Sequence, residues 1–201
     1  MKAKVIVQEA GTAPPMDQAA YDQLGTEQAE AMLKEGRALI AQQGAATPAT
    51  GDAGAVHEVA VGVESHAGAE VLQFLPREVA ISLGDTVRWT NLSMHEPHTV
   101  TFLGNEDPPE FILVEPQEAG PPTLVFNPIM FFPAGGDTYD GTSLTGSGAF
   151  GPELAEFDDE FPRTATYELT FTAPGAYRYY CAFHSGSLDD EHGMVGTVTV
   201  T

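Results

Sequence analysis

The fold is indicated most clearly by the stretch YRYYCAFHSGSLDDEHGMVGTVTV, which runs from Tyr177 to Val200. Both of its ends are rich in aromatic or β-branched residues, the types that favour strands. Between these ends lie Cys181, the only cysteine of the chain, and then His184 and Met194. The pattern predicts two neighbouring strands joined by a loop that collects a thiol, an imidazole and a thioether.

Strand-like alternation of apolar residues recurs along much of the remaining chain. The segment HEVAVGV puts Val59, Val61 and Val63 on one face, and EVAISLGDTVRWTN holds two alternating runs separated by a Gly-Asp turn signal. HTVTF and TYELTFTAPGAYRYY add further strands. We expect Trp89 to fill the core and Asn91 to serve a turn. Short strands separated by Gly and Pro turns predict an all-β fold, an antiparallel sandwich.

The N-terminal quarter of the chain has a different composition. MDQAAYDQLGTEQAEAMLKEGRALIAQQ is rich in helix-forming residues, with Thr26 as the expected N-cap and Gly44 as the stop. GAATPATGDAGA then indicates a linker. We therefore expect a helical extension over residues 1–54, packed on the domain or on a neighbouring subunit, and a β-domain over residues 55–201. The apolar face of the helix is predicted to hold Ala29, Met32, Leu33, Gly36 and Ile40.

A long insert, about residues 103–163, interrupts the predicted strands. It is rich in Pro, Gly and Phe, and a loop of this length inside a compact domain is often functional. Its many apolar residues must pack against something. We expect an ordered lid over one end of the sandwich or, alternatively, a surface that contacts another protein.

Composition and charge exclude several classes of partner. The chain has 201 residues, an apolar fraction of 42% and a formal net charge of −21. Such a surface repels phosphate backbones and anionic lipids, which argues against nucleic acid, and it suits either solubility or a basic protein partner. No stretch is long and apolar enough to span a bilayer. The start of the chain lacks the apolar core of a secretory signal, which indicates a cytosolic protein or a mature form without its leader.

The chemistry of the chain is concentrated in Cys181, His184 and Met194, together with His98 from the segment MHEPHTVTF. One thiolate, two imidazoles and a weak thioether are the ligand set of an electron-transfer copper centre. The thiolate favours Cu(I), and the imidazoles serve both oxidation states. A loop between two strands can present three ligands at one end of a sandwich, and His98 is suitably placed to supply the fourth.

Three motifs in this order give the chain a resemblance to the cupredoxins, the small blue copper proteins of the plastocyanin, halocyanin and auracyanin kind. The motifs are GDTVRWTN at residues 84–91, PHTV at residues 97–100, and YYCAFH with GMVGTVTV within residues 179–200. The resemblance covers roughly residues 70–201, interrupted by the insert. It implies a Greek-key β-sandwich.

The resemblance also implies the site and the role. His98, Cys181 and His184 would be equatorial ligands and Met194 the axial ligand of one copper ion per chain, which alternates between Cu(I) and Cu(II). Thr99 would tie the His98 strand to the ligand loop. The partners would be redox proteins, such as a basic cytochrome or an oxidase domain. The compartment would be the periplasm or another space exposed at the cell envelope.

The ligand loop departs from the family pattern in its length. Nine residues, SGSLDDEHG, separate His184 from Met194, where the family usually has fewer. They bring alternative ligands, and a carboxylate in place of Met194 would give a red-copper-like or catalytic centre. We favour His184 over the later histidine, because Cys-x-x-His puts both side chains at one tight turn. The alternative ligands are Asp189, Asp190, Glu191 and His192.

Other functions have less support in the sequence. A copper enzyme with further copper sites needs more histidines, and the chain has no His-x-His pair. Of the remaining histidines, His57 and His66 are expected at the surface and His95 in a loop. We therefore predict a protein that is not an enzyme. Copper storage or delivery is a further alternative, although the six methionines form no Met-rich tract.

Overall fold

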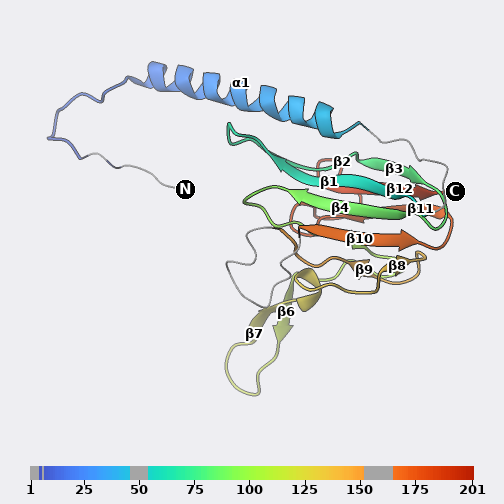
Figure 1. The fold of residues 1–201 in the computed structure, drawn as a ribbon. Coiled ribbons are helices and arrows are strands. Elements are labelled where there is room, and N and C mark those ends of the chain that lie inside the picture. Colours follow the sequence, from blue (N-terminus) through green and yellow to red (C-terminus); the bar gives the residue numbers. More distant parts are fainter. Residues whose placement is uncertain (1–4, 6, 46–53, 152–164) are drawn as a thin grey trace.

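The computed structural model describes residues 5, 7–45, 54–151 and 165–201, and it contains two five-stranded sheets packed face to face (Figure 1). The first sheet has the order β2-β1-β4-β10-β8 and the second β3-β12-β11-β5-β9. The predicted β-sandwich is confirmed, but the expectation of purely antiparallel pairing was wrong, because three of its strand pairs are parallel. Its strands are β1 Val56–Glu64, β2 Glu70–Leu75, β3 Glu78–Ile81, β4 Thr86–Leu92, β5 Thr101–Phe102, β8 Thr138–Tyr139, β9 Thr145–Gly146, β10 Thr166–Phe171, β11 Gly175–Tyr180 and β12 Val195–Val200.

The chain crosses repeatedly between the two sheets, so strands that are distant in sequence become neighbours. β1 pairs with β4 and β3 with β12 in parallel, whereas β11 and β12 form the antiparallel pair predicted around the ligand loop. Such non-consecutive neighbours are typical of Greek-key connections. The core between the sheets is aromatic: Trp89 is fully buried, as predicted, and its ring meets those of Phe102 and Tyr179 at centroid distances of 5.8 and 5.3 Å.

A bulge at Gly62 reverses the two faces of β1, so that the valines before it and the valine after it point to opposite sides of the sheet. The register of β1 against both β2 and β4 shifts between Val61 and Val63, and Gly62 has a φ of 61°. Val59 and Val61 lie in the core between the sheets, but Val63 packs in a second cluster with Ala60 and the helix. The prediction that all three valines share one face was wrong, because the extra residue of a bulge reverses the alternation after it.

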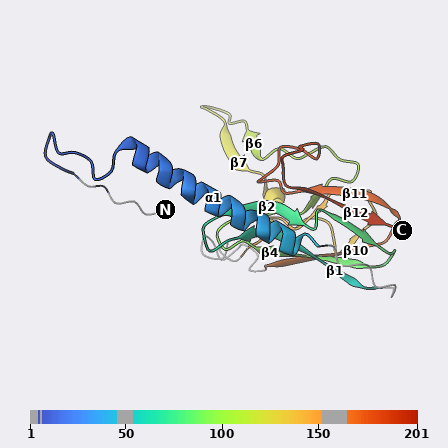
Figure 2. The same cartoon turned by 90° about the horizontal axis from the view of Figure 1, so that it is seen from above.

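The predicted helical extension is α1, Gln18–Gln43, which lies across the edge of the first sheet and extends past it at its N-terminal end (Figures 1 and 2). It stops at Gly44, as predicted, but its N-cap is Asp17, whose carboxylate accepts the N–H of Ala20 at 2.8 Å. The expected cap, Thr26, was wrong: it lies inside the helix, and its hydroxyl donates to the carbonyl of Asp22. No helix in the described part of the chain combines the length and apolar character needed to cross a membrane.

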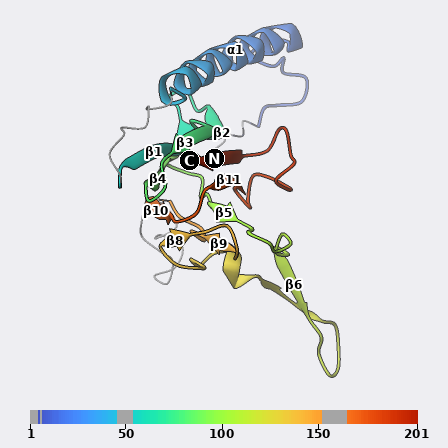
Figure 3. The same ribbon diagram turned by 90° about the vertical axis from the view of Figure 1, so that its right-hand side faces the viewer.

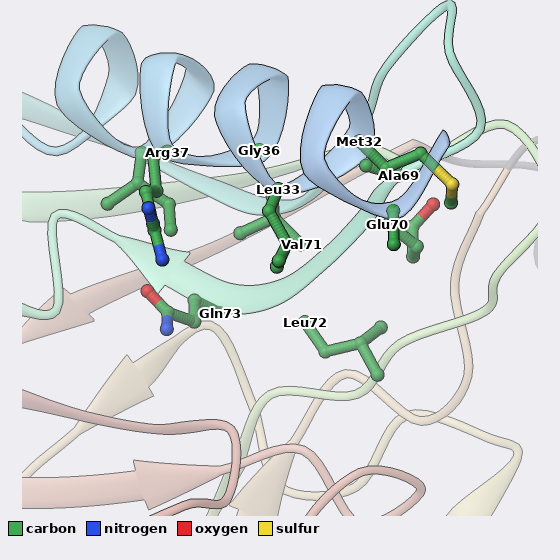
Figure 4. A pocket seen from close by; sticks show the side chains of 11 residues that line it. Met32, Leu33, Gly36, Arg37, Ala69, Glu70, Val71, Leu72 and Gln73 are labelled. Atoms are coloured by element: carbon green, nitrogen blue, oxygen red, sulfur yellow. The ribbon is translucent and has the colours of Figure 1, made fainter. Parts of the chain in front are cut away.

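The helix face predicted from the apolar spacing is the face that meets the domain. Gly36 lies on this face and is the one buried residue of α1. A Cβ placed on Gly36 would lie 3.7 Å from a methyl group of Val71 in β2. Beside this contact, an open cleft of about 680 Å³ lies between α1 and β2 (Figure 4). Its lining from the helix is Ala29, Met32, Leu33, Gly36, Arg37 and Ile40. Residues 46–53 of the predicted linker, which spans residues 44–55, lie outside the described part of the chain.

The insert carries elements of its own. β8 extends the first sheet by pairing with β10, and β9 extends the second by pairing with β5. Between these and β5, the strands β6 (Ile112–Glu115) and β7 (Thr123–Phe126) form a hairpin, followed by the short 3-10 helix η1 (Pro128–Met130). The hairpin projects from the sandwich on the side opposite α1 (Figure 3). The end of the insert, residues 152–163, lies outside the described part of the chain.

Candidate metal centre

The loop between β11 and β12 is closed at its neck by main-chain hydrogen bonds. The N–H of Cys181 donates to the carbonyl of Met194 at 2.9 Å, and that of Met194 donates to the carbonyl of His184 at 3.2 Å. The N–H of His184 donates to the carbonyl of Cys181 at 3.2 Å, which forms the predicted Cys-x-x-His turn. The three residues are therefore held together although nine residues lie between His184 and Met194.

His98 reaches the same point from a different part of the chain. It forms an antiparallel bridge with Phe150: its N–H donates to the Phe150 carbonyl at 3.1 Å, and the reverse bond measures 2.9 Å. The Sγ of Cys181 lies 3.8 Å from Nδ1 of His98 and 3.5 Å from Nδ1 of His184, and the two Nδ1 atoms are 3.1 Å apart. One sulfur and two ring nitrogens thus converge on one point.

The donor set fits a metal ion in its burial and its chemistry. His98 and Cys181 are fully buried, and the side chain of His184 is 17% exposed. Burial, with a smaller contribution from His184, lowers the pKa of His98 to about 3, so its ring is neutral and able to coordinate. Burial raises the pKa of the Cys181 thiol against the opposing effect of the Thr99 N–H, so that bound metal would have to displace its proton.

Thr99 connects the two segments, as the resemblance implied. Its N–H points at Sγ of Cys181 over 3.3 Å, and its Oγ1 accepts the N–H of Ala182 at 2.7 Å. A hydrogen bond to the sulfur stabilises negative charge there, and the second bond fixes the residue that follows. The strand that carries His98 and the ligand loop therefore cannot move apart without losing both bonds.

Gly62, in the bulge of β1, supports His98 from the side away from the cluster. A Cβ on Gly62 would lie 2.3 Å from Nε2 of His98, so only glycine allows the ring to sit there. Gly62 was not identified from the sequence as part of the site. The available signal was a glycine inside an alternating strand, which indicates a bulge or a close approach of two segments.

Glu96 is the second residue near the cluster that was missed. Its Oε2 lies 3.7 Å from Nε2 of His184, the ring nitrogen that faces away from Cys181. Burial lowers the pKa of His184, and the nearby Glu96 carboxylate opposes that effect. A carboxylate behind a ligand imidazole is a common outer partner in metal sites. The signal in the sequence was only its position two residues before His98.

None of the alternative ligands in the longer loop belongs to the cluster. Asp189 pairs with Arg178 at 2.7 Å, and Asp190 accepts the N–H groups of His192 and Gly186. Within the described residues, the one group of three or more His, Cys, Asp or Glu side chains suited to a metal is His98, Cys181 and His184. Met194 is buried in the same core cluster as Cys181, and its role as axial ligand stays a prediction.

Two of the other histidines lie where they were predicted and one does not. His66 is exposed, and His95 lies in a loop with its Nδ1 2.7 Å from Glu64. His57 was predicted at the surface, and this was wrong: it is buried, and its Nε2 donates to Asp85 at 2.9 Å. Asn91 serves a turn, as predicted, by accepting the N–H of Ser93 at 2.8 Å.

Comparisons with known proteins add structural neighbours. No protein-family model matches the chain. An oxidised mutant of amicyanin is 18% identical, with 76% of this chain and 86% of that chain covered and a TM-score of 0.33. A mutant plastocyanin of a fern is 20% identical, with 72% and 99% covered and a TM-score of 0.35. Because these values are low, the interpretation of the site rests on the geometry of this chain. In the two-sheet sandwich, His98, Cys181 and His184 are positioned to hold one metal ion. One thiol with two imidazoles is a donor set that suits copper.

Proposed function

We propose that the protein is a one-electron carrier with a type 1 copper centre. His98, Cys181 and His184 are its equatorial ligands and Met194 its axial ligand. A bound copper ion would supply the Cu(I)/Cu(II) couple. The observation that carries the proposal is the convergence of one thiol sulfur and two Nδ1 atoms, all within 4.8 Å of one another. This combination, with a weak axial thioether, is characteristic of electron-transfer copper sites.

The hydrogen bonds around the donors suit rapid electron transfer. Main-chain bonds close the loop at its neck, and Thr99 joins both segments. Donors held in this way change position little when the charge of the site changes, so the barrier to electron transfer stays low. Met194 is proposed as axial ligand because it is buried beside Cys181 and its main chain contacts both loop ligands.

The alternative functions have weaker support. A red-copper-like or catalytic centre needs a carboxylate from the loop or an open position, but Asp189 is paired with Arg178 and Asp190 is engaged by N–H groups. Storage or delivery of copper favours exposed donors that exchange ligands, whereas His98 and Cys181 are fully buried. His184 is the most exposed of the three donors. We therefore propose that electrons pass through it to redox proteins of the periplasm or cell envelope.

Copper loading tests the proposal directly. Adding one Cu(II) per chain to the metal-free protein is expected to give an intense visible charge-transfer band that a mild reductant bleaches. Met194→Gln should keep the band, shift its wavelength and lower the reduction potential, because an amide oxygen stabilises Cu(II) better than a thioether does. Cys181→Ser, which removes the thiolate, is the control and should show no such band. A wild-type protein that binds one copper without this band contradicts the proposal.

Removal of the Glu96 charge is expected to raise the reduction potential. The carboxylate lies 3.7 Å from Nε2 of His184 and favours the more positive, oxidised site. In Glu96→Gln we expect a rise on the order of tens of millivolts, which decreases with added salt because both groups are partly exposed. Voltammetry of the copper-loaded protein measures it. Glu78→Gln, at an exposed position in β3, is the control with the same change of charge; equal shifts in both variants would exclude a local effect.

A further inference from the structure

The β6–β7 hairpin exposes an apolar face that the described chain covers only at its base, where the ring of Phe126 meets those of Phe111 and Phe131. Ile112 pairs with Phe126 and Val114 with Leu124, so these four side chains share one face of the hairpin. Their exposed fractions are 38, 60, 59 and 66%, respectively. A two-stranded hairpin alone has marginal stability in water. An apolar face on such a projecting element is therefore costly unless it serves contact with another molecule.

The base of the hairpin is anchored to the proposed copper loop by aromatic rings. Phe111 and Phe131 each lie 5.8 Å from Phe183, measured between ring centroids, and Phe126 lies 5.6 Å from Phe111. Phe183 stands between the cysteine and the histidine of the ligand loop. Asn127 locks the base further, since its side chain donates to the carbonyl of Glu110 at 2.9 Å. The exposed face is thus continuous with the loop that carries His184.

The charge around the hairpin selects among the molecules that could cover it. Residues 89–162 contain no Lys or Arg. A second copy of the chain would bring like charges together, and an anionic membrane would be repelled in the same way. A partner with a basic surface would be attracted. The acidic residues in the hairpin and in the segment leading to it are Glu106, Asp107, Glu110, Glu115 and Glu118.

We infer that the β6–β7 hairpin is a docking arm for a redox protein whose basic surface surrounds an apolar patch. The inference rests on the proposed electron-carrier function. The patch of the partner covers Val114 and Leu124, its basic groups face Glu115 and Glu118, and its redox centre comes close to Phe183 and the exposed edge of His184.

The rate of electron exchange with a basic cytochrome c tests the docking arm. We expect the second-order rate with the copper-loaded full chain to decrease with added salt. Val114→Ser combined with Leu124→Ser should lower it about tenfold, because apolar contacts at the centre of an interface carry much of its affinity. Leu83→Ser, at an exposed leucine between β3 and β4, is the matched control and should leave the rate unchanged. Exchange with ferricyanide, which needs no docking arm, should be equal in all three proteins.

A second variant keeps the test valid if the serine substitutions unfold the hairpin. Glu115→Gln combined with Glu118→Gln preserves the apolar face and should lower the cytochrome rate about threefold at low salt, with the difference lost at high salt. A cytochrome rate that is unchanged in both hairpin variants overturns the inference. So does a hairpin-dependent dimer in sedimentation, or hairpin-dependent binding to neutral phosphatidylcholine vesicles, when the cytochrome rate is unaffected.

Calorimetry with the metal-free protein separates failure of the docking arm from failure of the proposed function. Cytochrome binding that depends on the hairpin, in a protein without a blue copper band, would refute the electron carrier and retain the docking arm. A blue protein whose cytochrome binding ignores the hairpin would refute the docking arm and retain the electron carrier.

Discussion

Gly62→Ala is expected to lower the affinity for copper about 100-fold and to destabilise the metal-free fold by roughly 2–5 kcal/mol. Gly62 has a φ of 61°, a conformation that costs other residues about 1–2 kcal/mol. In addition, a Cβ there would lie 2.3 Å from Nε2 of His98. The His98 ring is fully buried, so it can avoid the methyl group only by moving its Nδ1 away from Cys181 or by displacing β1.

Gly68→Ala is the matched control for this prediction. Gly68 also has a positive φ, 83°, and lies in the connection between β1 and β2, but nothing lies within 4 Å of a Cβ placed there. Gly68→Ala should therefore lower the free energy of unfolding only by the conformational cost, about 1 kcal/mol, and should bind copper as the wild type does. Copper titration and urea unfolding of the metal-free proteins measure both effects. Equal copper affinities of the two variants would show that Gly62 does not position His98.

The cluster was predictable because most of its members lie in one short segment between two strands. Once the runs around Cys181 and Val195 are paired, the chemistry of the donors and the tight Cys-x-x-His turn bring Cys181, His184 and Met194 to one end of the sandwich. His98 was found because it precedes an alternating run. These inferences need only strand pairing and ligand chemistry, and the structure brings His98, Cys181 and His184 together as expected.

What the sequence did not reveal depends on register and on tertiary contacts. A bulge shifts the alternation after Gly62, and no local pattern says which residue it will bring against His98. The helix begins at Gln18 rather than after Thr26 because the Asp17 carboxylate caps the N–H of Ala20. His57 was predicted at the surface because its buried partner, Asp85, lies 28 residues away in the sequence, and no local pattern indicates that the two residues meet.

Asp85→Asn is expected to destabilise the protein by about 3–5 kcal/mol at neutral pH, because it leaves buried hydrogen-bond donors without an acceptor. Asp85 is fully buried. Its Oδ1 accepts the N–H groups of Gly54 and Ala55, both at 3.0 Å. Its Oδ2 accepts the N–H of Ser82 and Nε2–H of His57, both at 2.9 Å. An amide would turn an NH₂ group toward one of these pairs of donors and leave them without an acceptor.

The loss should depend on pH in a defined direction. Burial alone raises the pKa of Asp85, but the hydrogen bonds from His57 and from the main-chain N–H groups outweigh it, and the pKa lies below its ordinary value of 3.8. A lowered pKa in the folded state stabilises the protein above the ordinary value, and this contribution is lost as the pH falls through the lower, folded value. The difference between wild type and Asp85→Asn should therefore be full at neutral pH and shrink in acid.

Urea unfolding of the metal-free proteins between neutral pH and about pH 3 measures this dependence. Asp140→Asn is the control: this carboxylate also accepts two hydrogen bonds, from the N–H and hydroxyl of Thr142, but it is exposed to water. Its loss should be much smaller than that of Asp85→Asn, because water replaces the missing acceptor. If the two variants lost the same stability, or if the loss in Asp85→Asn were independent of pH, the ionised Asp85 carboxylate would not be what holds the start of β1 to the β3–β4 turn.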